Sequence, residues 1–501
     1  MATETELKLK CTPQTLAKLK RHPFLRSLQQ ERARSVHLDN IYFDTPDFAL
    51  QRARMALRLR RSGRQWLQTL KGGGSVQAGL HQRNEWEMPV AGEQLELDAI
   101  KAAGARLPKG VAKHLHAVFR TDFSRAIREL RYADARIELC MDQGEVSCAT
   151  GKTGICELEL ELLEGPPVRL FQLALELHDI VPFELEAVSK AERGYRLLTG
   201  QADAPAKARS PSLAGLTRCG EVLQALCAAC LLHLQANLSG AINGDDPEYL
   251  HQLRIALRRL RTVLSLAASL APDETLAHLR QEFAALGRNL GVLREQDVFI
   301  DETLRPLLQQ RPGHTGLHAL LALSAGQRDA AIAEIRAPHW QHHVQDMILR
   351  LALWLQGDYW LQTPLQGAAE DMQKQGLRRR VKRFLKHAQA PDPADPASLH
   401  RLRILAKKVR YFLELFGLYK SSGGALHDAL VSLQTKLGEY NDTVNVEAQI
   451  ARLKAFQPDA VALQEACALV QGWNLQRQIM LQAQLPKQLG RTVKALRLIL
   501  S

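Results

Sequence analysis

The feature that most constrains the fold of this chain is a change in the spacing of its apolar residues near residue 200. Before this point, short segments alternate apolar and polar residues, which is typical of strands. From about residue 219 onward, apolar residues recur at helical spacing. A chain of 501 residues is also too long for one ordinary core. We therefore predict a strand-rich domain over 1–200, a linker rich in Pro, Ala and Ser over 201–218, and a helical domain over 219–501.

Strand-like patterns occur in eight segments of the first domain: 5–10, 37–43, 55–60, 66–71, 83–90, 119–130, 136–141 and 156–162. Glycine or proline marks several turns between them. Thr12 followed by Pro13 predicts that a helix begins directly after the first strand, because threonine caps helices well and proline fits their first turn.

Charged residues alternate with apolar ones along several of these segments. Glu4, Glu6 and Lys8 share one face of the first strand, since successive side chains point to opposite sides. On any single strand this is what an ordinary half-exposed sheet would show. Its recurrence along many strands, with charges of both signs, favours a closed barrel whose charged face lines a tunnel. Arginine and lysine bind phosphate oxygens, and clustered carboxylates bind hard divalent cations such as Mg²⁺ or Mn²⁺.

These residues also carry a family resemblance. The ExExK segment 4–8 resembles the signature of the CYTH superfamily, the triphosphate tunnel metalloenzymes. Similar pieces follow in family order at 42–45, 57–60, 69–71, 119–121, 142–144, 157–161, 189–190 and 193–195. The ordered set is much more specific than one short motif. The resemblance implies an α+β domain with an eight-stranded antiparallel β-barrel tunnel that cleaves inorganic triphosphate with bound Mg²⁺ or Mn²⁺.

The same resemblance implies roles for individual residues. The implied metal ligands are Glu4, Glu6, Glu159 and Glu161. The implied catalytic residues are Glu4, Glu6, Lys8, Asp142 and Glu157. The implied phosphate-binding residues are Lys8, Arg58, Arg60, Lys71, Arg83, Arg120, Lys190 and Arg193.

The helical half contains an internal repeat. The pattern that begins at His251 and continues through Arg254, Arg258 and Arg261 recurs at His400, Arg403, Lys407 and Arg410. In a helix each set of four falls within an arc of about 80°. One basic stripe is usually a solvated helix face, but recurrence of the same pattern favours a duplicated bundle with a shared function.

This repeat resembles the CHAD domain, a helical module associated with CYTH partners. The resemblance implies an all-α domain of two duplicated four-helix bundles, with halves over about 219–365 and 366–501. It also implies that the repeated basic residues line a groove that binds long-chain inorganic polyphosphate. A further basic run over 378–383 could extend this track, although alone it fits a nucleic-acid patch or a solvated face.

The formal charge of +13 indicates a polyanionic partner, and the helical part carries +9 of it. The main prediction is hydrolysis of inorganic triphosphate to pyrophosphate and phosphate in the tunnel, together with polyphosphate binding by the helical domain. The alternatives are an adenylate cyclase or thiamine triphosphatase on the same tunnel, or a non-catalytic protein that binds polyphosphate or nucleic acid. Aromatic residues are only 5%, which argues against nucleic acid because single-strand binders stack bases on them.

No signal-peptide pattern opens the sequence, and no uninterrupted apolar run approaches the ~20 residues of a membrane span. We therefore expect no membrane partner and a cytoplasmic location, with association with polyphosphate granules as a further expectation.

Overall fold

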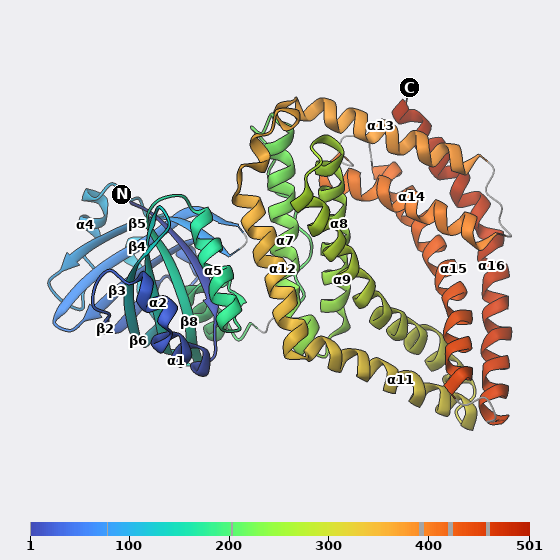
Figure 1. Cartoon of the computed structure of the whole chain (residues 1–501), viewed down its shortest axis with the longest axis horizontal. Helices are drawn as coiled ribbons and strands as arrows, with labels where there is room; N and C mark the ends of the chain where they lie inside the picture. The colour runs from blue at the N-terminus through green and yellow to red at the C-terminus, as the bar shows by residue number, and fades with distance from the viewer. Residues whose placement is uncertain are drawn as a thin grey trace. The chain divides into compact units, whose positions relative to one another are not determined.

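The computed structural model describes residues 2–77, 79–201, 204–389, 395–418, 424–456 and 461–500. The chain divides into two compact units (Figure 1). The first contains residues 1–205 and 341–357, and the second contains 206–340 and 358–501. The stretch 341–357, expected with the helical domain, therefore groups with the barrel. Within this first unit the rings of His178 and His342 stack at a centroid distance of 4.0 Å.

The first unit is built around a closed antiparallel barrel. Its strands are β1 (Ala2–Lys10), β2 (Arg34–Asp44), β3 (Met55–Ser62), β4 (Gln65–Gln77), β5 (Leu80–Val90), β6 (His116–Tyr132), β7 (Ala135–Cys148) and β8 (Gly151–Glu164). The sheet order is β5-β4-β3-β2-β6-β7-β8-β1, and pairing of β5 with β1 closes the ring. The eight expected strands and the barrel are confirmed, and the observed strands extend beyond the predicted segments.

Apolar residues on the outer face of the barrel pack beneath short helices. Leu7, Leu9, Leu158 and Leu160 are fully buried on β1 and β8. Near them lie α1 (Pro13–Arg21) and α5 (Val168–Ile180), with α2 (Pro23–Leu28) beside α1. The expected helix start is confirmed, since the Thr12 side chain accepts a hydrogen bond from the Thr15 amide at 3.2 Å. On another side, α3 (Ala49–Arg52), α4 (Leu97–Ala102) and the 3₁₀ turn Val111–Lys113 cover β3 to β5. With its apolar face covered by helices, the barrel can turn its charged face inward.

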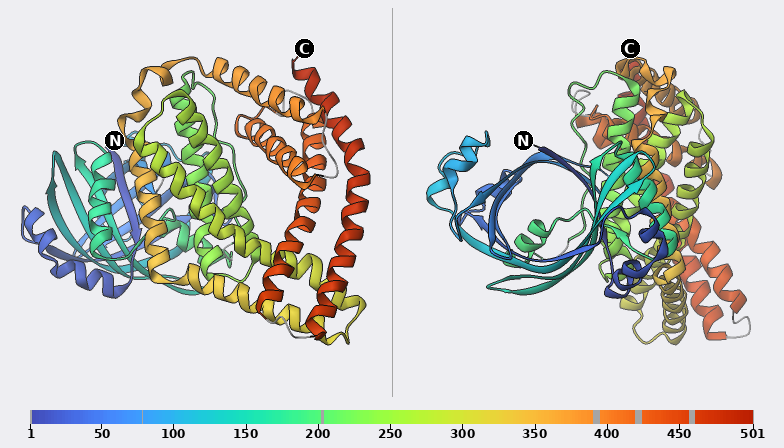
Figure 2. Two further views of the ribbon diagram at one scale, coloured as in Figure 1. Left: turned by 45° about the vertical axis from the view of Figure 1, so that its right-hand side comes forward. Right: turned by 60° about the vertical axis from the view of Figure 1, so that its left-hand side comes forward.

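One helix lies inside the barrel. After the short strand β9 (Glu184–Leu185), which pairs with β1, the chain forms α6 (Lys190–Thr199) within the ring of strands (Figure 2, right). Tyr195 of α6 packs in an interior cluster with Tyr42, Phe119 and Phe123, and its hydroxyl donates to Asp44 at 2.7 Å. This aromatic cluster fills one end of the interior and positions the first turn of α6 beside the charged part of the barrel.

The region after the barrel is helical, as expected. Its elements are α7 (Cys219–Asn243), α8 (Pro247–Leu270), α9 (Glu274–Phe299), a π-helical turn (Ile300–Leu304), α10 (Arg305–Gln310), α11 (Thr315–Arg336), α12 (Pro338–Gln356), 3₁₀ turns Asp358–Leu361 and Thr363–Gln366, α13 (Ala369–Ala388), α14 (Pro396–Leu415), α15 (Gly424–Phe456) and α16 (Val461–Leu500). One core joins α13, α14, α15 and the C-terminal half of α16. A second core joins α11 with the ends of α9, α15 and α16.

The two repeated basic stripes lie on α8 and α14. Both helices begin in the same way, with an aspartate cap, Asp246 or Asp395, followed by proline. Each cap stands five residues before its histidine, so the duplication includes the local helix start as well as the basic face.

The helix α7 has the length and hydropathy of a possible membrane span, and 56% of its apolar window is buried inside the protein. Core helices of soluble domains have the same properties, so this single helix is weak evidence for a membrane.

Candidate active site

The strand register decides which side chains face the barrel interior. Directly opposed residues of an antiparallel pair share a face of the sheet. Glu6 lies opposite Glu161, and Lys8 lies opposite Glu159. Following the register around the ring puts these ionisable residues, among others, on the interior face: Glu4, Glu6, Lys8, Arg58, Arg60, Lys71, His81, Arg83, Glu85, Glu87, Arg125, Glu138, Asp142, Glu157, Glu159 and Glu161. The helix α6 adds Lys190 and Arg193, which both pair with Glu157.

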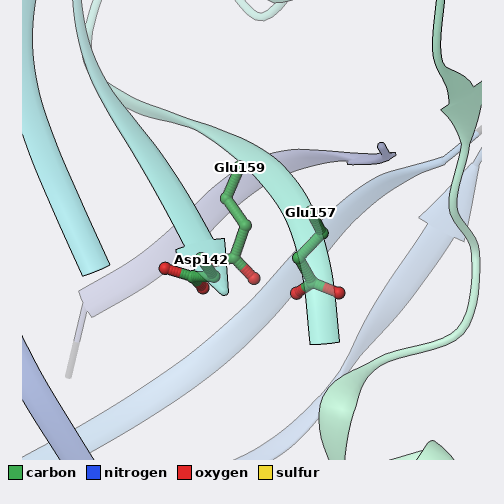
Figure 3. A group of neighbouring side chains, drawn as sticks. All are labelled: Asp142, Glu157 and Glu159. Carbon is green, nitrogen blue, oxygen red and sulfur yellow. The ribbon is translucent and has the colours of Figure 1, made fainter. Parts of the chain in front are cut away.

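Three buried carboxylates gather in the middle of this interior. Asp142, Glu157 and Glu159 each place an oxygen within 4.8 Å of the others (Figure 3). They are surrounded by cations. Arg125 forms a bidentate pair with Asp142 at 2.7 and 2.6 Å and also contacts Glu159. Lys190 reaches all three carboxylates, at 2.6 Å to Asp142 and 3.0 Å to Glu159.

Two further cations complete this central cluster. Lys8 pairs with Glu159, and Arg193 pairs with Glu157. Burial lowers the pKa of Lys8, but the carboxylates of Glu159 and Glu6 outweigh burial and raise it overall. The pKa of Lys190 is also raised, because Asp142, Glu157 and Glu159 outweigh burial. The three central carboxylates are thus already neutralised by the protein's own charges.

A second group of carboxylates has fewer cations. Burial, reinforced by the charge of Glu4, raises the pKa of Glu161 to about 7. Burial also raises the pKa of Glu4, although Lys71 pairs with it. Burial opposes ionisation of Glu6, but the charges of Lys8 at 2.8 Å and of Lys71 together lower its pKa to about 2. Two of these three carboxyl groups therefore lie where more positive charge would stabilise them.

The opposite situation holds on the wall formed by β3. Arg58 is buried and Arg60 is half-buried, and their nearest carboxylates, Glu85 and Glu87, are 3.8 Å away. The Nε atom of Arg58 has no hydrogen-bond partner among the described residues. Burial, followed by repulsion from Arg58, lowers the pKa of Arg60 to about 10. A bound anion would therefore stabilise the charged forms of the arginines on this wall.

The structure does not bring Arg120 into the tunnel. Phe119, Thr121, Phe123 and Arg125 face inward along β6, so Arg120 faces outward. Its side chain is 52% exposed and lies 3.1 Å from Glu93. Arg125, which the motif comparison missed, takes the interior position. The sequence held part of this signal, because the odd spacing puts these two arginines on opposite faces, but the strand register decides which of them faces inward.

The basic stripes of the helical unit meet at a cavity of about 370 Å³ between α8, α9, α14 and α15. Six of the eight predicted polyphosphate-binding residues line it: His251, Arg254, Arg258, Arg261, Arg403 and Lys407. Arg294 and Arg477 add further positive charge, and Glu295, Glu302 and Asp442 supply fewer negative charges.

The other two predicted residues do not line this cavity. The His400 ring nitrogen Nδ1 lies 2.6 Å from the amide oxygen of Asn441. Arg410 pairs with Glu414 at 3.2 Å and stacks near the ring of Tyr411. His400 thus contacts the cavity lining through Asn441.

The cavity cations are poorly neutralised. Arg254 Nη1 and Arg403 Nε are buried without a hydrogen-bond partner among the described residues. Burial, then repulsion from Arg258, lowers the pKa of Arg254 to about 10. Burial, then repulsion from Arg403 and Arg258, lowers the pKa of Lys407 to about 7. The missing side chain of Gly291 leaves room for the guanidinium of Arg254, since a Cβ there would stand 3.3 Å from Nη1.

Two known protein families match the two parts of the chain that contain the barrel interior and the helical cavity. Residues 2–195 match the CYTH domain family, and residues 225–452 match the CHAD domain family. The chain contains a CYTH domain and a CHAD domain. The CYTH domain supplies the barrel interior, and the CHAD domain supplies the helical cavity.

Two relatives illustrate the match. An inorganic triphosphatase of Haemophilus influenzae is 31% identical over 201 residues, which cover 39% of this chain and 55% of that protein. The chain thus spans about half the length of this curated relative. The crystal structure of the CHAD domain from the plant Ricinus communis is 31% identical, with a TM-score of 0.50. That match covers 59% of this chain and 97% of the plant chain.

Proposed function

We propose that the CYTH domain hydrolyses inorganic triphosphate to pyrophosphate and phosphate with a divalent cation, and that the CHAD domain binds long-chain polyphosphate. The observation that carries the catalytic part is the division of charge in the barrel interior. The carboxylates nearest to Arg58 and Arg60 are 3.8 Å away, whereas Glu4 and Glu161 have raised pKa values, even though Lys71 pairs with Glu4. A triphosphate bound together with a divalent metal ion would supply an anion to the arginines and a cation to the two carboxyl groups.

The protein's cations would bind and orient the substrate. One guanidinium group can bind two phosphate oxygens at once, and an ammonium group neutralises them as a point charge. In phosphoryl transfer most of the catalysis comes from such positioning and charge stabilisation. Water attacks a terminal phosphorus atom, the bridging P–O bond breaks, and pyrophosphate leaves. Lys8 and Lys190, buried and charged, would stabilise the negative charge that builds up on the oxygens.

The donor set fits a hard divalent cation such as Mg²⁺ or Mn²⁺, because it consists of carboxylate oxygens. Glu4, Glu6 and Glu161, with Glu159 beside them, would hold it. The group formed by Asp142, Glu157 and Glu159 is compact, but four of the protein's own cations already neutralise it. A bound metal ion would polarise phosphate oxygens and lower the pKa of an attacking water.

The helical cavity supports the second half of the proposal. Its cations come from two repeated helices, and several lack partners that a phosphate polymer would provide. The matching positions on α8 and α14 suit a ligand that itself repeats. A cytoplasmic location, with association with polyphosphate granules, is part of the same proposal.

The test is phosphate release from triphosphate, ATP, thiamine triphosphate and long-chain polyphosphate, each with Mg²⁺, Mn²⁺ or EDTA. We expect fastest release from inorganic triphosphate, none with EDTA, and tight binding but slow turnover of long chains. Preferred turnover of ATP or thiamine triphosphate would contradict the substrate. Tighter binding of DNA than of polyphosphate at equal salt would contradict the second half.

A further inference from the structure

One buried histidine of the barrel interior remains without a role in the proposed function. His81 lies on β5, is fully buried, and stands opposite Glu6 in the register between β1 and β5. Its ring nitrogen Nδ1 is 3.1 Å from Nη2 of Arg83. Its other ring nitrogen, Nε2, is 3.4 Å from the backbone oxygen of Glu186.

These two contacts define the proton on the ring. An arginine side chain can only donate, so Nδ1 of His81 must accept from Arg83. The proton of the neutral ring therefore sits on Nε2 and points to Glu186. Burial, followed by the nearby charge of Lys8, lowers the pKa of His81 to about 4, so the ring stays neutral at physiological pH.

Arg83 differs in this respect from the other cations of the interior. Lys8, Lys71, Arg125 and Lys190 each have a carboxylate within 4.0 Å, and so do Arg58, Arg60 and Arg193. Among the described residues, Arg83 has none, and His81 is the side chain that binds it. A neutral acceptor fixes the guanidinium while leaving its positive charge uncompensated.

We propose that His81 is a positioning residue that holds Arg83 for contact with a substrate phosphate. This inference rests on the proposed triphosphate site but assigns a role that the family resemblance does not. A carboxylate at the same place would fix Arg83 equally well, but it would compete with the phosphate for the guanidinium. The imidazole avoids this competition, because it carries a lone pair and no negative charge.

Two substitutions separate this role from a purely structural one. In His81→Asn, the amide oxygen takes approximately the place of Nδ1 and can still accept from Arg83, but the contact with Glu186 is lost. In His81→Gln, the amide reaches the place of Nε2 and can still donate to Glu186, but the acceptor for Arg83 is lost. Each variant therefore keeps one contact and removes the other.

The experiment measures KM and kcat for tripolyphosphate on the full chain with saturating Mg²⁺, together with the melting temperature. We expect His81→Gln to raise KM about tenfold with kcat changed less than about twofold, and His81→Asn to stay within about threefold of wild type. Arg83→Ala should raise KM at least as much as His81→Gln. Adding His81→Gln to Arg83→Ala should then have little further effect, because both act through one contact.

The opposite ranking would overturn the inference: a larger KM for His81→Asn than for His81→Gln would make His81 an anchor for the segment before α6. Additive increases of KM when His81→Gln and Arg83→Ala are combined, or an unchanged KM in Arg83→Ala alone, would also overturn it. If His81→Gln does not fold, the decision rests on whether His81→Asn resembles wild type or Arg83→Ala. If wild type releases no phosphate, the proposed function fails, and the same ranking is sought in tripolyphosphate binding by calorimetry.

Discussion

The barrel interior and the helical cavity both collect lysine and arginine, but they treat these charges in opposite ways. In the barrel, Lys190 lies among three carboxylates, and they raise its pKa. In the cavity, Lys407 lies among arginines, and burial together with their repulsion lowers its pKa to about 7. The barrel thus supplies charges of both signs at fixed positions, which suits a reaction. The cavity leaves positive charge uncompensated, which suits binding of a polyanion.

The strongest test of this contrast removes a barrel carboxylate that has a cation-binding role in the proposal. Glu4→Gln or Glu6→Gln should lower metal-dependent triphosphate turnover at least about a hundredfold. Because Glu4 belongs to a repelling group, Glu4→Gln should not lower the melting temperature of the metal-free protein. Turnover at saturating Mg²⁺ and thermal unfolding are the two measurements.

The matched control is Glu145→Gln, because Glu145 pairs with Lys152 at the protein surface. It should behave like wild type. Near-normal turnover in both Glu4→Gln and Glu6→Gln would place the metal elsewhere, and the group of Asp142, Glu157 and Glu159 would be the next candidate.

The next test removes charge from the cavity. The double variant Arg254→Ala, Arg403→Ala should weaken binding of long-chain polyphosphate about ten- to a hundredfold, because each guanidinium is a charged contact in a buried setting. The salt dependence of the affinity should also become shallower, since fewer counterions are released. Triphosphate turnover should change much less than binding does.

Titrations of wild type and variant with polyphosphate at several salt concentrations measure both effects. The surface pair Lys487→Ala, Arg491→Ala on α16 is a suitable control with the same loss of charge, because it lies outside both the cavity and the basic run 378–383. An equal loss of affinity in this control would mean that total charge, and not the cavity, binds the polymer.

The sequence predicted the strands and the two basic stripes because both depend on local periodicity. Strand alternation alone assigns Glu4, Glu6 and Lys8 to one face, and the register confirms that they face inward. Alternation also puts Arg120 and Arg125 on opposite faces of β6, but only the register with β2 and β7 shows that Arg125 is the one that faces inward. His81 carried no signal, because its role depends on a contact with Arg83 and on burial by segments distant in sequence. Packing likewise decides whether a charged side chain has an opposite charge beside it, as the contrast between Lys190 and Lys407 demonstrates.

A smaller effect should follow from the carboxyl group of Glu161. Its pKa of about 7 means that part of the group is protonated at neutral pH. A metal ion binds the ionised form, so binding releases a proton and weakens as pH falls, by at most about tenfold per pH unit below 7. Calorimetry with Mn²⁺ at pH 6, 7 and 8 measures this change. In Glu161→Gln the affinity for Mn²⁺ should be lower and should change less with pH. An unchanged pH dependence would exclude Glu161 as a ligand.

The smallest expected effect, and the one that most directly contrasts the two regions, concerns Lys407. Its ordinary pKa is 10.5, and in the cavity it falls to about 7. A bound phosphate polymer favours the charged ammonium and raises this pKa again. Above pH 7 the cavity must therefore take up a proton when it binds, so affinity should fall a few-fold from pH 7 to pH 8. Binding heats in buffers of different ionisation enthalpy would detect the proton directly.

The control variant is Lys407→Arg, which should keep the charge and lose this pH dependence, because arginine stays protonated throughout this range. A slope that persists in Lys407→Arg would assign the proton to His251, whose pKa burial also lowers. The midpoint of the pH dependence of polyphosphate affinity would then lie below pH 7.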